Sequence, residues 1–296
     1  MADLGFDSPW RVHWRLLGCD PAPVAGMIRE AGPLAVTLEV CSPDELSGLE
    51  LPWPNASFVV VLQDWKMVRD GLSGSDVARW EFPVTGPEEA RQAAELHSGR
   101  LPPWGGAFRW LPVRGRLTDL PVMLELAAKN RFGVTLPNRR ADDITARKED
   151  VLPLPGEPGA LDRDTVMRLV EELGKERIRV HDFILSQTMG LSTTEPGGCE
   201  AANALVFVDE AGDVYPCDSL RVRMGSLRRE SLRDVWEKPI RTRIRRDVSS
   251  LPPVCSSCDV LPLCRGGCRG IAFHVTGHFG APDMLCGHHE CKEDDL

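Results

Sequence analysis

Four cysteines lie close together near the end of the chain, at Cys255, Cys258, Cys264 and Cys268, with the spacing C-x2-C-x5-C-x3-C. Thiolates this dense are typical of a soft metal centre, because polarisable sulfur selects zinc, Cu(I) or iron–sulfur clusters. Two glycines, Gly266 and Gly267, precede the last cysteine and permit positive φ angles, so the loop can wrap a cluster and point its N–H groups at sulfide. The loop therefore predicts a metal–thiolate centre.

The other cysteines are distributed unevenly along the chain. Eight of the ten follow residue 198, and only Cys19 and Cys41 precede it. We expect these two to be buried core residues. The asymmetry predicts a domain boundary near residue 190, with one domain over 1–190 and a cysteine-rich domain over 191–296.

Two bland explanations compete with a cluster. A disulfide framework is disfavoured, because the chain is not small and its first residues, MADLGFDSPWRVHW, lack the basic and apolar regions of a secretory leader. A structural zinc site stays open. Zinc usually takes paired C-x2-C knuckles, however, and only one C-x2-C occurs here.

Seven cysteines and one glycine follow the pattern C-x12-G-x4-C…C-x2-C-x5-C-x3-C…C, which resembles the SPASM domain. That domain carries the auxiliary clusters of radical-SAM enzymes that modify ribosomal peptides and proteins. The neighbouring segments VFVDEAGDVYPC, GSLRRESLRDVW and CRGGCRG agree with it. The resemblance implies two [4Fe–4S] clusters with interleaved ligands. The implied ligands are Cys199, Cys217 and Cys268 for the first cluster, and Cys255, Cys258, Cys264 and Cys286 for the second.

The resemblance leaves the fourth site of the first cluster undecided. It is either open or filled by Cys291, a histidine or a partner's thiol, and Cys291 could equally replace Cys286 in the second cluster. Four histidines crowd the same region, and we expect them to be surface residues or hydrogen-bond donors rather than ligands. They are His274, His278, His288 and His289.

The N-terminal part alternates strand and helix patterns, which predicts βα units and a parallel sheet. Expected strands cover 11–18, 33–40, 57–64, 77–84, 107–113 and 132–137, and expected helices cover 21–32, 87–99 and 117–130. Residues 139–160 read as a loop, and a helix, Gly174 and a strand close this half. A doubly wound open sheet would fit these patterns nearly as well. The resemblance instead implies an α/β fold in which a partial (βα) radical-SAM-like barrel precedes the SPASM domain.

The C-terminal part predicts a β-hairpin and short helices. The hairpin turns at 211–213 and brings Cys217 back near Cys199. Ser231 is placed to cap a helix with Asp234 as its capping-box partner, and Pro239 is expected to kink or restart that helix.

The sequence lacks the C-x3-C-x2-C triplet that holds the SAM-binding cluster of radical-SAM enzymes, and WGGAFRW at 104–110 lacks the acid of their Gly-Gly-Glu motif. We therefore expect no SAM cleavage by this chain alone. This combination resembles the SPASM-domain protein of the Geobacter-type peptide system GeoRSP. The resemblance implies, as partners, a radical-SAM/SPASM enzyme, a small peptide-binding protein of the PqqD family and a ribosomal peptide.

Charge and hydropathy exclude other classes of protein. The net charge of −9 argues against nucleic-acid binding, and no apolar run is long enough to cross a membrane, so a cytoplasmic protein is expected. Within this acidic chain, residues 221–246 carry nine arginines and one lysine. They form either a solvated helix face or a docking surface for an acidic peptide or partner, with Arg243 and Arg245 as the residues to test.

Three functions are compatible with these features. The first is an iron–sulfur accessory protein that binds a peptide or partner or transfers electrons. The second is a catalytic peptide maturase with a degenerate radical-SAM core, whose open cluster site acts as a Lewis acid. The third is a zinc-stapled scaffold.

Overall fold

The computed structural model describes residues 7–68, 72, 76–141, 161–181, 185–186, 189–191, 199–259, 261–264, 266–283 and 286. The chain divides into two compact units. Unit 1 comprises Met1–Phe82 and Cys199–Ser249, and unit 2 comprises Pro83–Gly198 and Ser250–Leu296. Each unit combines segments from both sides of the expected boundary near residue 190, and that boundary stays a prediction.

Unit 1 is built on a mostly parallel sheet with the strand order β10-β9-β8-β1-β2-β3-β4. Its strands are β1 (Arg11–Arg15), β2 (Ala35–Val40), β3 (Ser57–Leu62), β4 (Arg79–Pro83), β8 (Leu205–Val208), β9 (Asp213–Tyr215) and β10 (Gly225–Ser226). Its helices are α1 (Ala22–Glu30), the 3-10 helix η1 (Pro43–Leu49), α6 (Leu232–Glu237) and α7 (Pro239–Ser249).

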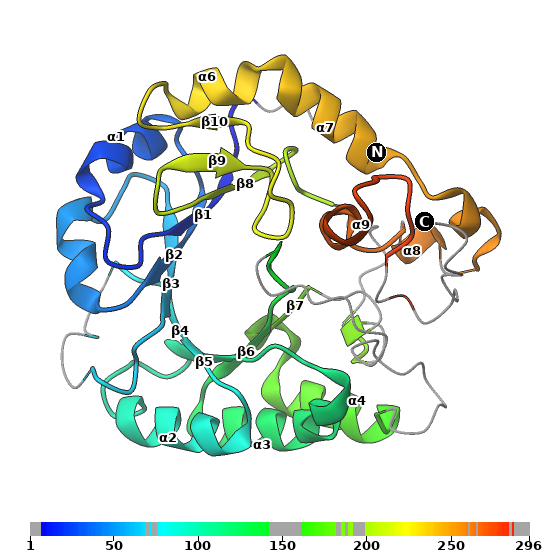
Figure 1. Ribbon diagram of the computed structural model, residues 1–296. Coiled ribbons are helices and arrows are strands. Elements are labelled where there is room, and N and C mark those ends of the chain that lie inside the picture. Colours follow the sequence, from blue (N-terminus) through cyan, green and yellow to red (C-terminus); the bar gives the residue numbers. More distant parts are fainter. Residues whose placement is uncertain are drawn as a thin grey trace. The chain divides into compact units, whose positions relative to one another are not determined.

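Strand β1 lies between β2 and β8 and runs parallel to both (Figure 1). In this register His13 lies opposite Thr37 on one side and Phe207 on the other. Side chains alternate along β1, so Val12 and Trp14 are buried on one face. The first strand of the chain is therefore completed by a strand that comes almost two hundred residues later.

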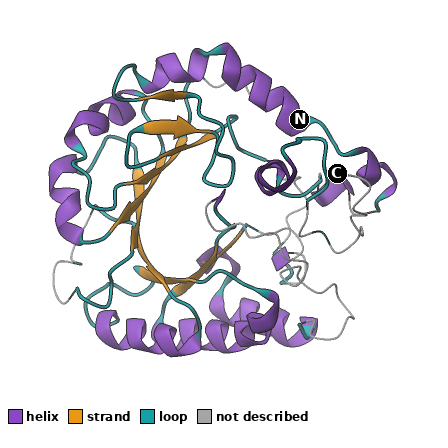
Figure 2. Ribbon diagram, in the orientation of Figure 1, coloured by secondary structure: helices purple, strands orange, loops and turns teal. Residues whose placement is uncertain are grey.

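Unit 2 contains the parallel strands β5, β6 and β7, with α2, α3 and α4 lying along one side of them (Figure 2). The strands are β5 (Gly106–Arg109), β6 (Gly133–Leu136) and β7 (Ile178–Val180). The helices are α2 (Pro87–His97), η2 (Arg114–Asp119), α3 (Leu120–Asn130), α4 (Arg163–Leu173), η5 (Lys175–Arg177), η6 (Pro253–Ser257), α8 (Leu261–Cys264) and α9 (Arg269–Thr276).

Helix α4 shows why these segments fold as they do. Its buried side chains, Val166, Leu169, Val170 and Leu173, recur at helical spacing and form one apolar stripe. The helix ends at Gly174, whose φ of 95° suits a residue without a side chain. The expected order of helix, Gly174 and strand is confirmed.

The predicted α/β fold class with a parallel sheet is confirmed, and the expected elements occur with their ends trimmed by a few residues. The C-terminal hairpin and short helices are also present. Ser231 caps α6 with Asp234, and α7 starts afresh at Pro239. Helix η1 was not predicted, and most of the expected loop at 139–160 lies outside the described residues. Among the described helices, none combines the length and apolar character that crossing a bilayer needs.

Candidate metal centre

The thiols expected to share the second cluster lie together in unit 2. Cys255 lies in η6, Cys258 follows that helix, and Cys264 ends α8. Cys286 comes close enough to interact electrostatically with both Cys255 and Cys264, and Cys258 interacts with Cys255. The fold thus links these four thiols through mutual contacts across 32 positions of sequence, from residue 255 to residue 286.

Burial makes these thiols reluctant to ionise in the metal-free chain. It raises the pKa of Cys264 to about 11, and the neighbouring Cys286 thiol raises that pKa further. Burial also raises the pKa of Cys255, which is 6% exposed, and Cys286 acts in the same direction. A bound cationic centre would supply the positive charge that converts such thiols to thiolates.

The two glycines of the dense loop behave as predicted for their backbone. Gly266 has a φ of 88° and Gly267 a φ of 72°, in the region that favours glycine. Both donate backbone hydrogen bonds to the sulfur of Cys264, which act against the upward shift of its pKa. A side chain at position 267 would also meet Asp283, since a Cβ there would lie 2.5 Å from that residue.

Cys268 is held at both its main chain and its sulfur. Its backbone N–H donates to Asp283 Oδ2 over 2.7 Å, and its Sγ accepts a hydrogen bond from Asn138 Nδ2 over 3.0 Å. The next residue, Arg269, is 1% exposed and donates to the carbonyl oxygens of Gly266, Phe279 and Ala281. The buried guanidinium therefore ties the loop before α9 to the segment after it.

The remaining cysteines of the first predicted set, Cys199 and Cys217, lie in unit 1. The hairpin returns as expected, because the N–H of Ala202 donates to the carbonyl oxygen of Pro216 over 3.4 Å. Arg245 from α7 is 3% exposed and donates to the carbonyl oxygens of Cys199 (2.7 Å) and Ala201 (3.3 Å). Because Cys268 belongs to unit 2, the first ligand set stays a prediction.

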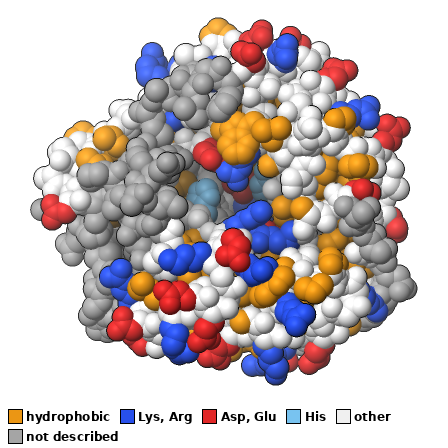
Figure 3. Space-filling model, turned by 180° about the vertical axis from the view of Figure 1, so that it is seen from behind, with side chains coloured by type: hydrophobic (Ala, Val, Ile, Leu, Met, Phe, Trp, Pro, Cys, Tyr) orange, Lys and Arg blue, Asp and Glu red, His pale blue; other side chains and the backbone are white. Residues whose placement is uncertain are grey.

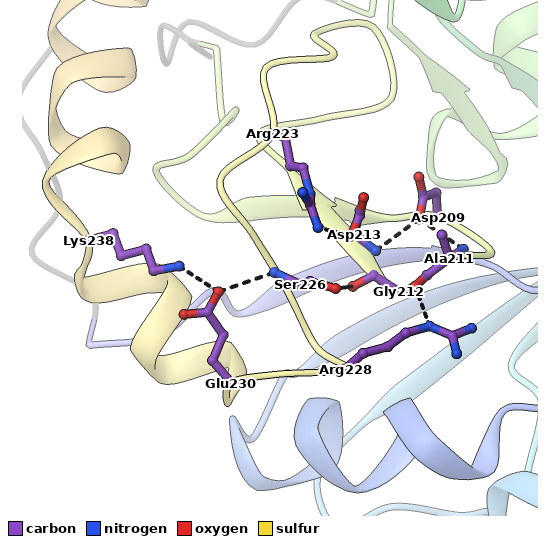
Figure 4. Close-up of polar contacts among 9 residues, drawn as sticks. All are labelled: Asp209, Ala211, Gly212, Asp213, Arg223, Ser226, Arg228, Glu230 and Lys238. Atoms are coloured by element: carbon purple, nitrogen blue, oxygen red, sulfur yellow. Dashed lines mark hydrogen bonds and ion pairs between the residues drawn. The ribbon is translucent and has the colours of Figure 1, made fainter.

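The turn of the hairpin explains the glycine of the cysteine pattern. Gly212 has a φ of 77°, and a Cβ there would lie 3.2 Å from Val24. Figure 4 shows Asp209 accepting hydrogen bonds from the N–H groups of Ala211 (3.0 Å) and Asp213 (2.9 Å). A left-handed residue and an aspartate cap together fix the turn that returns the chain to Cys217.

Several predicted residues are not brought to the centre. His274 and His278 are exposed, and Cys291, His288 and His289 lie outside the described residues. The expectation that Cys19 and Cys41 are buried core residues is wrong, because both follow the carboxyl ends of strands and are partly exposed. Within the described part of the chain, no three histidine, cysteine or acidic side chains are grouped for a single metal ion.

The arginines of 221–246 separate into two kinds. Arg223 pairs with Asp213 over 2.6 Å, and Arg228 donates to the carbonyl oxygen of Ala211 (Figure 4). The expectation that Arg245 belongs to a docking surface is wrong, since it is buried against Cys199. Three others are exposed and have no ion pair or hydrogen bond from their side chains among the described residues: Arg229, Arg233 and Arg243. Elsewhere, charges of both signs lie interspersed on the face seen in Figure 3.

Sequence reasoning missed the residues that hold the cysteines in place. Asn138, Asp283 and Arg245 contact cysteines 130, 15 and 46 positions away. Nothing in the local sequence signals such long-range partners. Arg269 stands directly after Cys268, and this position inside CRGGCRG was the one available hint.

Comparison with known proteins places these features in a family context. Residues 199–259 match SPASM, described as an iron–sulfur cluster-binding domain. The AdoMet-dependent heme synthase of Methanosarcina barkeri is 33% identical over 89 residues, which are 30% of this chain and 25% of that protein. The chain thus matches about a quarter of the length of the heme synthases. The PqqA peptide cyclase of Granulibacter bethesdensis is 27% identical over 266 residues, 79% of this chain and 67% of the cyclase.

Solved structures of radical-SAM/SPASM proteins share the fold. The structure of anSMEcpe with bound AdoMet has a TM-score of 0.60 at 11% identity, covering 93% of this chain and 94% of that one. Its complex with AdoMet and the Cp18Cys peptide has a TM-score of 0.58 at 13% identity, covering 93% of both chains. The chain therefore has the α/β fold of radical-SAM/SPASM structures, with an iron–sulfur cluster-binding SPASM domain at 199–259.

Proposed function

We propose that this protein is an iron–sulfur accessory protein of a radical-SAM peptide-modification system. It binds two auxiliary-type [4Fe–4S] clusters, presents them to a peptide or partner enzyme, and does not cleave SAM by itself. The observation that carries the proposal is the group of four thiols, Cys255, Cys258, Cys264 and Cys286, linked by mutual contacts in unit 2.

The donor set fits an iron–sulfur cluster. All four groups are thiols, the softest ligands that proteins offer, and their burial favours a centre that neutralises thiolate charge. Backbone N–H groups point at Cys264, as donors do at cluster sulfurs. Such a cluster, when bound, supplies reversible one-electron transfer. The first cluster takes Cys199, Cys217 and Cys268, and its fourth site is open or filled by Cys291 or another ligand.

The partners in this proposal are those of the GeoRSP system: a radical-SAM/SPASM enzyme, a PqqD-like protein and a ribosomal peptide. Two comparisons support a peptide partner, namely the likeness to a peptide cyclase and the fold shared with a peptide-bound structure. The absence of C-x3-C-x2-C from the sequence supports the assignment of SAM cleavage to the partner.

Anaerobic purification tests the cluster assignment. We expect about eight iron and eight sulfide per chain, the content of two [4Fe–4S] clusters. The variant Cys255→Ser with Cys258→Ser should lose about half of both, whereas Cys19→Ser with Cys41→Ser should lose none. Zinc without iron or sulfide would establish the structural scaffold instead.

A catalytic peptide maturase is the second candidate, because the likeness to the peptide cyclase covers most of the chain. The two functions differ in one product. The accessory protein should release no deoxyadenosine from SAM under reducing conditions until a radical-SAM partner is added. Deoxyadenosine formed by the reconstituted chain alone would establish the enzyme.

The exposed arginines offer a docking surface for an acidic segment of the partner or peptide. Arg233 and Arg243 lie on α6 and α7 in a segment of ten basic and three acidic residues, within a chain of net charge −9. We expect Arg233→Glu with Arg243→Glu to weaken partner binding at least tenfold at low salt. The matched control, Arg100→Glu with Arg163→Glu, makes the same charge change in unit 2. Equal affinities of both variants would leave a solvated helix face.

A further inference from the structure

We infer that Asn138 is a positioning residue for Cys268, and that its side-chain amide raises the reduction potential of the cluster that Cys268 binds. This inference rests on the proposed function, because it concerns the clusters assigned there. It goes beyond that function by naming a residue outside the cysteine pattern that controls one cluster and not the other.

The first support is the position of Asn138. It follows β6 by two residues, so it lies at the carboxyl end of a parallel strand, the edge where functional side chains gather in α/β folds. Its Nδ2 donates to Cys268 Sγ over 3.0 Å, which is short for a hydrogen bond to sulfur. Both residues belong to unit 2, so the contact lies within one compact unit.

The second support is how little freedom Cys268 has otherwise. Asp283 accepts the hydrogen bond of its backbone N–H over 2.7 Å, and position 267 has no room for a side chain beside Asp283. Buried Arg269 fixes the following residue through three carbonyl oxygens. With the main chain fixed, rotation about the Cα–Cβ bond of Cys268 is the freedom that remains. The Asn138 hydrogen bond selects one rotamer and so sets the direction of the sulfur.

The electrostatic consequence follows from charge. Reduction adds one electron to a cluster, and part of the added negative charge falls on the ligand sulfurs. An N–H donor aimed at such a sulfur stabilises the reduced form more than the oxidised form, which raises the reduction potential. Cys264 receives its donors from the backbone of Gly266 and Gly267, whereas Cys268 receives one from a side chain. A single substitution can therefore remove a donor from one cluster alone.

The test uses Asn138→Leu, which keeps the approximate volume and removes the donor. The matched control is Asn130→Leu, because Asn130 donates from the same kind of amide to the carbonyl oxygen of Leu126 and contacts no cysteine in the described chain. Iron and sulfide are measured first, and the potential of each cluster follows from a redox titration monitored by electron paramagnetic resonance. We expect one potential to fall in Asn138→Leu, the other to stay, and both to stay in Asn130→Leu.

The outcomes separate this inference from the proposed function. Wild-type protein without iron or sulfide would overturn the proposed function. Two clusters with unchanged potentials in Asn138→Leu would overturn the inference alone. If Asn138→Leu loses a cluster, Asn138→His, which restores an N–H donor, must recover both the cluster and a potential near the wild-type value. A histidine variant that behaves like the leucine variant would show a merely structural role and overturn the inference.

Discussion

Arg245 donates a hydrogen bond from Nη1 to the carbonyl oxygen of Cys199 over 2.7 Å, across 46 positions of sequence. The guanidinium is 3% exposed and also reaches Ala201, so a buried charge holds the main chain at the first cysteine of the SPASM pattern. This contact turns an arginine of the basic segment into part of the framework of unit 1.

Replacing this arginine should destabilise the protein. We expect Arg245→Met to lower the free energy of unfolding by about 2 kcal/mol, because hydrogen bonds from a charged donor are lost. Urea unfolding of the metal-free protein measures the change. Arg243→Met is the matched control, since Arg243 is exposed two residues away and should change stability by less than about 0.5 kcal/mol. Similar losses in both variants would argue against the Arg245 contact.

Two glycine-to-alanine substitutions should act in opposite directions. Gly212→Ala should destabilise unit 1 by about 1–2 kcal/mol, because its φ of 77° strains an L-residue. Gly26→Ala should stabilise it by about 0.5–1 kcal/mol, because Gly26 lies inside α1 with open space around its Cα. Chemical denaturation of both variants gives the two signs, and a shared sign would contradict the turn geometry.

The pKa of Tyr215 can be read directly, because it is the one tyrosine in the sequence. Burial raises its pKa, Asp209 raises it further, and Arg221 opposes the shift. We expect tyrosinate absorbance of the metal-free protein to appear above the ordinary pH of about 10. Asp209→Asn should bring the transition back down, and Arg221→Gln should move it up.

The same shift gives stability a pH dependence. The folded state binds the phenol proton more tightly than the unfolded state, so the contribution of Tyr215 is complete below about pH 10. It is lost as the pH rises through the folded pKa. Tyr215→Phe should therefore weaken the loss of stability on the alkaline side, and an unchanged alkaline profile would contradict this linkage.

Cys41 should be a slow thiol despite its partial exposure. Burial raises its pKa, and the charges of Glu45 and Asp64 raise it further. Alkylation at neutral pH, followed by mass spectrometry of the peptide, should be slower than for a free thiol of ordinary pKa. Asp64→Asn removes one of the charges and should speed the reaction. Faster labelling of the wild type than of Asp64→Asn would refute the electrostatic cause.

Local chemistry explains how much of this architecture was predictable. The βα alternation, the capping box of Ser231 and Asp234, the restart at Pro239 and the turn at Gly212 all depend on residues near in sequence. The placement of β8 beside β1 was not predicted, because pairing between distant strands leaves no local pattern. Cys19 and Cys41 were misjudged because residue type alone does not show that each follows a strand end.

The candidate site divides in the same way. The spacing of the cysteines indicated which thiols would share a region, and Cys255, Cys264 and Cys286 do contact one another. The residues that orient them were invisible, because an asparagine after a strand or an arginine in a basic helix has many ordinary roles. Only the folded chain shows that Asn138 reaches a sulfur and that Arg245 reaches a backbone carbonyl.

The pairing of β1 with β8 has a consequence for biosynthesis. While the ribosome is still making the middle of the chain, the β1 edge that will receive residues 205–208 exposes unpaired N–H and C=O groups. Unit 1 can close only once that late segment has emerged, so the nascent chain must keep this edge from other polypeptides throughout most of its translation.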